Sequence, residues 1–202
     1  ASLAAVGEIS SSTVHEMRNP LSSVKINLQA LKKKVEGDPT YSELAAIALE
    51  QVERVENMLS DLLQYGKPLE LKPRPVRFSD LAGDVLPLVQ EDAQAKNVSI
   101  QVKDRMGGHR LNVDPEQIRR ALTNLVVNAV QAVDAGGTVW IEANLNAEPS
   151  ARAIISVVDD GPGIADDKLE KIFRPFFTTR TSGTGLGLAN VRKIVEYHGG
   201  AV

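Results

Sequence analysis

The chain has 202 residues, a net charge of −3, 43% hydrophobic and 4% aromatic residues, and no cysteine. Nucleic acid is disfavoured as its main partner, because binding the phosphate backbone needs a surplus of Lys and Arg. Disulfides and thiol chemistry are excluded, which is compatible with a reducing compartment. No apolar run approaches the roughly 18 residues of a membrane helix. The length therefore indicates one or two domains with cores of their own, expected in the cytoplasm.

The first 65 residues predict two long helices, because apolar residues recur in alternating steps of three and four. Gly37-Asp38-Pro39 separates the helices, and Thr40 with Glu43 forms a capping-box pattern at the start of the second. A lone hairpin would expose both apolar seams, so we expect two copies to form a homodimeric four-helix bundle. The seam residues are Val14, Met17, Leu21, Val24, Leu28, Leu31 and Val35, then Leu44, Ala48, Gln51, Val55, Met58, Leu62 and Tyr65.

A second domain is expected after a proline-rich linker. Gly66-Lys67-Pro68, Pro73 and Pro75 interrupt the helical pattern. Strands and helices then mix, which predicts an α+β sandwich with helices on one face of a mixed sheet. The domains are accordingly predicted as 1–66, linker 67–75, and 76–202. Strands are expected near 74–78, 98–103, 138–144 and 153–158, and helices near 79–96, 115–133 and from about 187 to 198.

The helix expected at 115–133 has a clear start. Asp114 is the predicted N-cap, Pro115 the first helical residue, and Gln117 stands at the capping-box position. The chain stops at Val202, where a further strand is expected to begin. We therefore interpret the sequence as a fragment whose second domain is C-terminally incomplete.

A reactive histidine is predicted on the first helix, in the run His15-Glu16-Met17-Arg18-Asn19-Pro20. Asn19 lies one helical turn after His15, and Pro20 removes a backbone donor, so a kink is expected there. Neutral imidazole is a good nucleophile near neutral pH, and the adjacent carboxylate of Glu16 can take its proton. A surface histidine beside a bent helix is the structural alternative.

Polar and glycine-rich runs in the second domain indicate a nucleotide site. Asn124 and Asn128 lie one turn apart on a helix that such residues disfavour, and their oxygens suit Mg²⁺. The run 159–164 (DDGPGI) follows an apolar strand, and the run 183–188 (GTGLGL) opens a helix whose amides suit phosphate. The structural alternatives are a solvent-facing polar stripe for the two asparagines and an ordinary strand-end turn for the run 159–164. Phe173, Phe176 and Phe177 are expected to pack in a lid or the core.

Taken in this order, the motifs resemble those of the sensor histidine kinases. His15–Pro20 followed by Leu21-Ser22-Ser23-Val24 resembles their phosphoacceptor box. Residues 114–188 resemble the asparagine, glycine and phenylalanine boxes of their ATP domain, which belongs to the superfamily of DNA gyrase and the MutL proteins. The resemblance implies that ATP phosphorylates His15 and that the phosphoryl group passes to an Asp of a response-regulator receiver domain. It also implies phosphatase activity toward that partner.

The resemblance assigns roles residue by residue. His15 is the implied acceptor, Glu16 the base, and Asn19 the residue that positions water for dephosphorylation. Asn128, with Asn124, is implied at the Mg²⁺–phosphate site, and Asp159 at the adenine amino group. The remaining implied ATP contacts are Gly161, Gly163, Arg180, Gly183, Thr184, Gly185, Leu186 and Gly187. Gln131 stands where many family members carry a basic residue.

Two other functions stay open on the sequence alone. One is an ATP-driven hydrolase or clamp of the gyrase type, but its relatives place a Glu where this chain has Asn124, which cannot act as a general base. The other is a dimeric interaction module with a relic ATP domain, disfavoured because all the motif residues are present. Membrane anchoring of the whole protein stays open, and we expect any such anchor to lie in segments outside this sequence.

Overall fold

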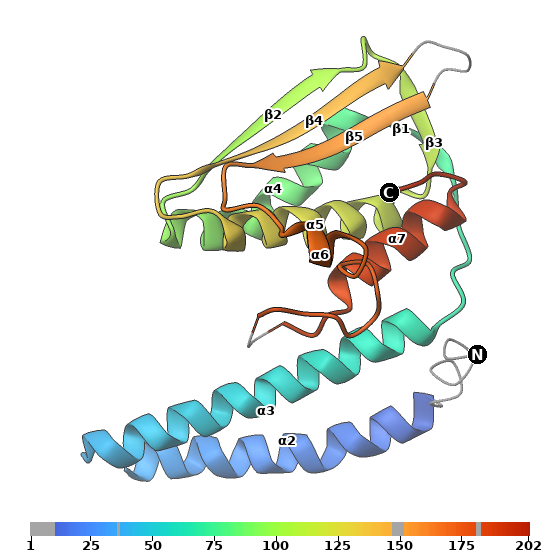
Figure 1. Ribbon diagram of the computed structural model, residues 1–202. Helices are drawn as coiled ribbons and strands as arrows, with labels where there is room; N and C mark the ends of the chain where they lie inside the picture. Colours follow the sequence, from blue (N-terminus) through green and yellow to red (C-terminus); the bar gives the residue numbers. More distant parts are fainter. Residues whose placement is uncertain (1–10, 36, 147–151, 181–182) are drawn as a thin grey trace. The chain divides into compact units, whose positions relative to one another are not determined.

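The computed structural model describes residues 11–35, 37–146, 152–180 and 183–202, and Figure 1 shows its elements. Contacts divide the chain into two compact units. The first comprises Ala1–Pro68 with Thr178–Leu186, and the second comprises Leu69–Phe177 with Gly187–Val202. Within the described residues, no helix is both long and apolar enough to span a bilayer.

The first unit contains a helical hairpin of α2 (Ser11–Lys34) and α3 (Pro39–Gly66), as the sequence predicts. Helix α2 continues through Pro20. The expected capping box at Thr40 is wrong, because the N-cap of α3 is Asp38. Its Oδ1 accepts from the amides of Thr40 and Tyr41 at 2.9 and 3.3 Å. With Pro39 as the first helical residue, the cap falls two residues earlier than the capping-box pattern suggested.

The hairpin has two apolar stripes, of which the predicted seam is mainly the outer one. Ala45, Val52, Leu59 and Tyr65 of α3 are buried, and of these only Tyr65 belongs to the predicted seam. Half-exposed side chains follow the predicted seam on both helices. A bundle helix needs a broad apolar face, and a heptad pattern alone marks only one part of it. The seam residues that remain 41–56% exposed are Met17, Val24, Leu31, Leu44 and Val55.

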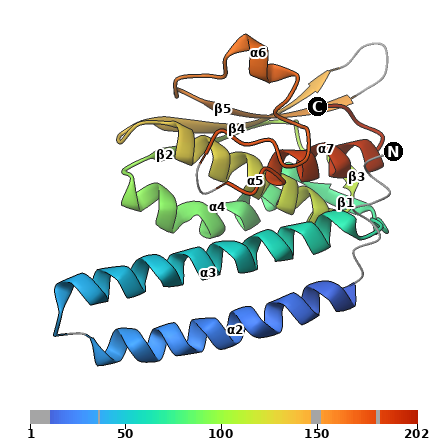
Figure 2. The same cartoon turned by 60° about the horizontal axis from the view of Figure 1, so that its bottom comes forward.

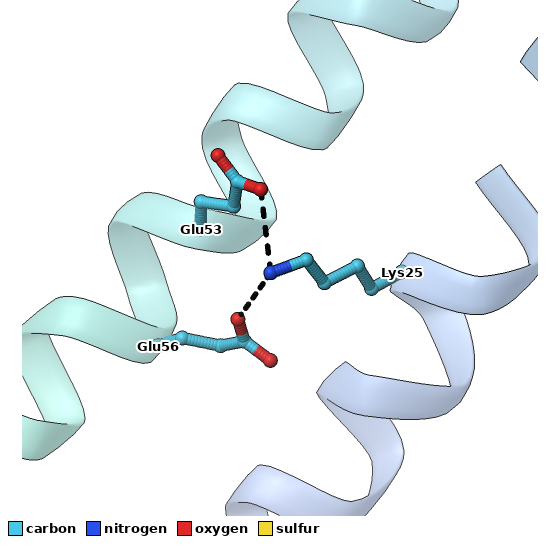
Figure 3. A network of polar contacts seen from close by, with 3 residues as sticks. All are labelled: Lys25, Glu53 and Glu56. Atoms are coloured by element: carbon cyan, nitrogen blue, oxygen red, sulfur yellow. Dashed lines mark hydrogen bonds and ion pairs between the residues drawn. The ribbon is translucent and has the colours of Figure 1, made fainter. Parts of the chain in front are cut away.

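A cross-helix ion pair sets the register of the hairpin (Figure 3). Lys25 Nζ on α2 lies 3.0 Å from Glu56 Oε2 and 3.3 Å from Glu53 Oε1 on α3. The hydrogen bonds that Lys25 donates to Glu56 and Glu53 raise the pKa of its ammonium group. Because all three side chains remain accessible to water, the pair specifies alignment more than it adds stability.

The second unit is an α+β sandwich with a mixed sheet, which confirms the predicted fold class. Strands β2 (Ser99–Arg105) and β4 (Thr138–Asn146) are parallel, while β5 (Arg152–Asp159) pairs antiparallel with β4. A separate antiparallel ribbon joins β1 (Arg74–Arg77) to β3 (Arg110–Val113). Strand β3 was not predicted, because four residues beside a Gly-Gly turn carry too short an alternation.

Helices cover one face of the three-stranded sheet, as Figures 1 and 2 show. They are α4 (Phe78–Ala95), α5 (Pro115–Ala132) and α7 (Gly187–Tyr197), and α6 (Asp166–Leu169) is a single short turn. Helix α5 is central, since it contacts α4, α7, β4 and β5. Its position rests on a core made of Phe78, Leu81, Val85, Val89, Leu122, Val126, Val130, Val139, Ile141 and Ile194.

The N-cap of α5 is the buried carboxylate of Asp114. Its Oδ1 accepts from the amides of Glu116 and Gln117, both at 3.1 Å, and its Oδ2 accepts from Lys72 N at 2.8 Å. Burial by itself raises the pKa of this carboxyl, but the three backbone donors outweigh it and leave the pKa below its usual value. The ionised form is therefore the one that stabilises the fold.

We predict an acid-sensitive stability for the second unit that depends on Asp114. Because the folded-state pKa is lowered, its contribution is present above the unfolded pKa and lost as the pH falls through the folded value. Urea unfolding followed by the fluorescence of Trp140, the only tryptophan, should give a lower unfolding free energy at about pH 3 than at neutral pH. Asp114→Asn, which keeps one acceptor, should lose about 1–2 kcal/mol at neutral pH and show a smaller pH dependence. An unchanged pH dependence in this variant would contradict the assignment.

Candidate functional site

Helix α5 presents the two asparagines to the start of α7. Asn124 Nδ2 donates to the carbonyl of Gly187 at 3.3 Å. A Cβ placed on Gly187 would lie 3.9 Å from both Asn124 Cγ and Asn128 Nδ2. The structure therefore brings three of the predicted ATP contacts together, with glycine backbone lying over two side-chain amides.

The glycine turn after β5 packs against the other end of α5. Asp159 Oδ1 accepts from Gly161 N at 3.0 Å. A Cβ on Gly161 would lie 2.7 Å from that oxygen and 3.2 Å from the backbone of Ala132. Gly163 has φ +76°, a conformation that favours glycine. Asp159 and Gly161 thus lie beside the C-terminus of the helix that carries Asn124 and Asn128.

The glycine loop before α7 groups with the hairpin unit. Thr184 Oγ1 donates to Asp61 Oδ2 of α3 at 2.9 Å and accepts from Leu186 N at 3.3 Å. Gly185 has φ +68°. A Cβ on Gly183 would lie 2.6 Å from Thr178 Oγ1. Sequence reasoning missed Asp61, because a lone acidic residue on a helix has no distinguishing pattern.

Arg180 lies at the edge of this loop. Its amide donates to Thr178 Oγ1 at 3.1 Å, and its carbonyl accepts from Gly183 N at 3.3 Å. Phe176, four residues earlier, has φ +66° and is exposed, so of the two expected placements, lid or core, the core does not hold for this residue. A positive φ is unusual for a bulky aromatic residue.

The predicted phosphoacceptor segment lies in α2. His15 and Glu16 are helical, but their side chains lie outside the described part of the structure. Asn19, one turn further along, is exposed. The other two histidines bond to backbone atoms, as expected for structural residues: His109 Nδ1 lies 2.7 Å from Met106 O, and His198 Nδ1 lies 2.7 Å from Ile194 O.

The donor set suits a magnesium ion delivered with a nucleotide. Across the residues that the structure describes, no group of three or more His, Asp or Glu side chains could hold a metal. Mg²⁺ bound to nucleotide keeps several waters and takes only one or two protein ligands. A single amide oxygen, such as that of Asn128, therefore fits this role.

The fold and the site together define a class of protein. A helical hairpin precedes an α+β sandwich. In the sandwich, α5 carries the asparagine pair, and the glycine turn and the glycine that opens α7 pack against α5. The family model described as His Kinase A (phospho-acceptor) domain matches residues 5–70. The model described as histidine kinase-, DNA gyrase B- and HSP90-like ATPase matches residues 113–202. The chain belongs to the sensor histidine kinase family.

Individual proteins agree with this assignment. Sensor histidine kinase ZraS of Salmonella typhi is 38% identical over 200 residues, which cover 99% of this chain and 43% of ZraS. The catalytic domain of histidine kinase ThkA is 33% identical, with a TM-score of 0.56, covering 62% of this chain and 81% of that one.

Two longer structures cover both units. Full-length ShkA in complex with AMPPNP is 28% identical with a TM-score of 0.74, over 95% of this chain and 41% of ShkA. ThkA in complex with the response regulator TrrA is 29% identical with a TM-score of 0.69, over 98% of this chain and 57% of that one. The chain thus spans less than half the length of ZraS.

We predict that Gly161→Ala destabilises the second unit. The new Cβ would meet Asp159 Oδ1 and the Ala132 backbone, so the turn must shift away from α5, at about 1–3 kcal/mol of unfolding free energy. Gly83→Ala is the matched control, because Gly83 lies in α4 with nothing within 4 Å of a Cβ. It should raise stability by roughly 0.5–1 kcal/mol. Thermal unfolding followed at Trp140 measures both, and equal effects would contradict the close approach at Gly161.

Proposed function

We propose that this chain is a kinase core that transfers the γ-phosphoryl group of ATP to His15 and then to an Asp of a response-regulator receiver domain. The observation that carries the proposal is the presence of both halves of this chemistry in one chain. Helix α2 contains His15, and α5 carries Asn124 and Asn128 under the glycine that opens α7. The solved ThkA–TrrA complex supports the class of partner.

The proposed reaction is an in-line displacement. A ring nitrogen of His15 attacks the γ-phosphorus, the new N–P bond forms as the bond to the β,γ-bridging oxygen breaks, and ADP leaves. Glu16 takes the proton that the imidazole loses. Bound Mg²⁺ offsets charge on the phosphates, and Asn128, with Asn124, is the side chain that would hold it.

The nucleotide contacts divide between base and phosphate. Asp159 accepts a hydrogen bond from the adenine amino group, while Gly161 and Gly163 let the backbone approach the base. The amides of Gly183, Thr184, Gly185, Leu186 and Gly187 suit the phosphates, and Arg180 is a further phosphate contact. The AMPPNP complex of ShkA supports nucleotide binding by this fold.

A hydrolase reading fits the site less well. Asn124 occupies the position where hydrolytic relatives would place a general base, and its amide donates to the Gly187 carbonyl. An amide cannot accept a proton from water at neutral pH. Bound ATP should therefore persist until His15 reaches it.

A homodimer through the hairpin is part of the proposal. Met17, Val24, Leu31, Leu44 and Val55 form a half-exposed apolar stripe that a second copy would cover in a four-helix bundle. The functional regions are then 1–66 for dimerisation and phosphotransfer, 67–75 as linker, and 76–202 for ATP binding. Prolines make the linker a candidate hinge.

We predict that His15→Gln abolishes labelling by γ-labelled ATP and changes nucleotide affinity by no more than a few-fold. The reason is that Gln lacks a nucleophilic ring nitrogen, whereas none of the proposed nucleotide contacts lies on α2. His109→Gln is the matched control and should label normally. Acid-labile, base-stable phosphate that persists in His15→Gln would overturn the acceptor assignment.

We predict that Asn19→Ala weakens dephosphorylation of the receiver domain more than it weakens autophosphorylation. An exposed amide one turn after His15 can orient a water molecule but takes no part in the attack on ATP. In one assay, phosphorylated receiver domain is incubated with the wild-type chain or with the variant, and the loss of its phosphate is measured. In a second assay, the wild-type chain and the variant are each incubated with labelled ATP to measure autophosphorylation. Equal losses in the two assays would remove the role from Asn19.

A further inference from the structure

Helices α5 and α7 run antiparallel, and a polar contact to α5 is made at each end of α7. At one end, Asn124 Nδ2 donates to Gly187 O at 3.3 Å. At the other, Asp114 N donates to His198 Nε2 at 3.0 Å. Figure 2 shows the two helices side by side. Asp114 and Asn124 are separated by about 15 Å along α5, close to the span of α7 from Gly187 to His198, so the two contacts match in spacing.

The tautomer of His198 follows from its partners. Nδ1 lies 2.7 Å from the carbonyl of Ile194, which can only accept, so Nδ1 carries the proton. Nε2 is then the acceptor for the Asp114 amide. Beyond it, Gly200 N bonds to Val195 O and Gly199 N bonds to Glu196 O, both at 2.9 Å, with Gly199 at φ +74°. This Schellman motif ends α7 and fixes the backbone that carries the imidazole.

His198 takes the place that the sequence assigned to Gln117. In a capping box, the Gln117 side chain would accept from the amide of Asp114. Instead, Gln117 Oε1 is buried and has no hydrogen-bond partner among the described residues. The predicted capping box is therefore wrong, because the acceptor comes from α7, 84 positions along the chain. This exchange leaves one side-chain acceptor unsatisfied and gains a link between two helices.

Apolar packing alone leaves the axial position of α7 loosely specified. Its buried residues are Ala189, Asn190, Val191 and Ile194, of which all but Asn190 are small or aliphatic. Such contacts are non-directional, whereas a hydrogen bond to a backbone amide fixes distance and angle. The bond at His198 thus sets where the opposite end of α7, with Gly187, meets Asn124 and Asn128.

We propose that His198 is a positioning residue of the nucleotide site: through the Asp114 amide it holds α7 in register with α5, so that Gly187 stays over Asn124 and Asn128. The inference rests on the proposed function, because it deepens the account of the same ATP site. Both hydrogen bonds of the His198 ring are to backbone atoms, and neither partner is a proposed site residue.

Two substitutions at His198 separate its two hydrogen bonds. His198→Asn keeps a donor near Nδ1 for Ile194 O but removes the acceptor at Nε2. His198→Gln places an amide oxygen near the Nε2 position and restores the link to Asp114. In His198→Asn, Gln117 can complete the capping box, so the helix stays capped while the two helices are unlinked. His109→Asn is the matched control, since the His109 ring likewise bonds a nearby backbone carbonyl, that of Met106.

The test uses the whole chain with AMPPNP and Mg²⁺ in calorimetric titrations. The affinity should fall roughly five- to tenfold in His198→Asn and stay within about two- to threefold of wild type in His198→Gln and His109→Asn. The amide resonance of Gly187, in ¹⁵N spectra without nucleotide, should shift in His198→Asn only. If His198→Asn binds like wild type with an unmoved Gly187 resonance, or if Asn and Gln are equally impaired, the positioning role is overturned. If the AMPPNP affinities of wild type and variants follow the expected pattern but ATP never phosphorylates His15, the kinase proposal is refuted and the positioning role of His198 is not.

Discussion

The buried carboxylate of Asp114 is the point on which the second unit depends. It caps α5, accepts the Lys72 amide from the segment that leads out of the hairpin, and its own amide bonds to the end of α7. Burying a carboxylate is costly unless its oxygens are satisfied, and here three backbone donors satisfy them. These hydrogen bonds fix the start of α5. The positions of its two asparagines, and of its C-terminus beside Gly161, depend on that start.

Local patterns predicted what depends on local chemistry. Asp114 and Pro115 marked the start of α5 correctly, and β-alternation located β2, β4 and β5 to within one or two residues. The failures involve competition between acceptors. Asp38 displaced Thr40 as the cap of α3, and His198 displaced Gln117 at α5. At α3, two residues close in sequence were both plausible caps, each for its own set of amides. At α5, the acceptor of the Asp114 amide lies 84 positions along the chain and is not visible in a short window.

The hairpin has a smaller buried core than the sandwich. Its inner stripe is narrow and its ion pair at Lys25 is only partly buried, so neither supplies a core comparable with that around α5. The outer apolar stripe, which the heptad pattern did predict, is the surface that a second copy would complete. In the proposed function, α2 brings His15 to the nucleotide site, and a helix whose packing a second copy completes can shift at a modest cost in free energy.

The central claim is that one chain holds both the acceptor and the ATP site for a single transfer. The most direct measurement is to incubate the chain with ATP and Mg²⁺ at neutral pH and locate the phosphoryl group by mass spectrometry under conditions that preserve phosphohistidine. The account predicts modification of His15 and release of one ADP for each phosphoryl group retained. Phosphate on a hydroxyl such as that of Thr184, or steady release of inorganic phosphate from an unmodified chain, would contradict it.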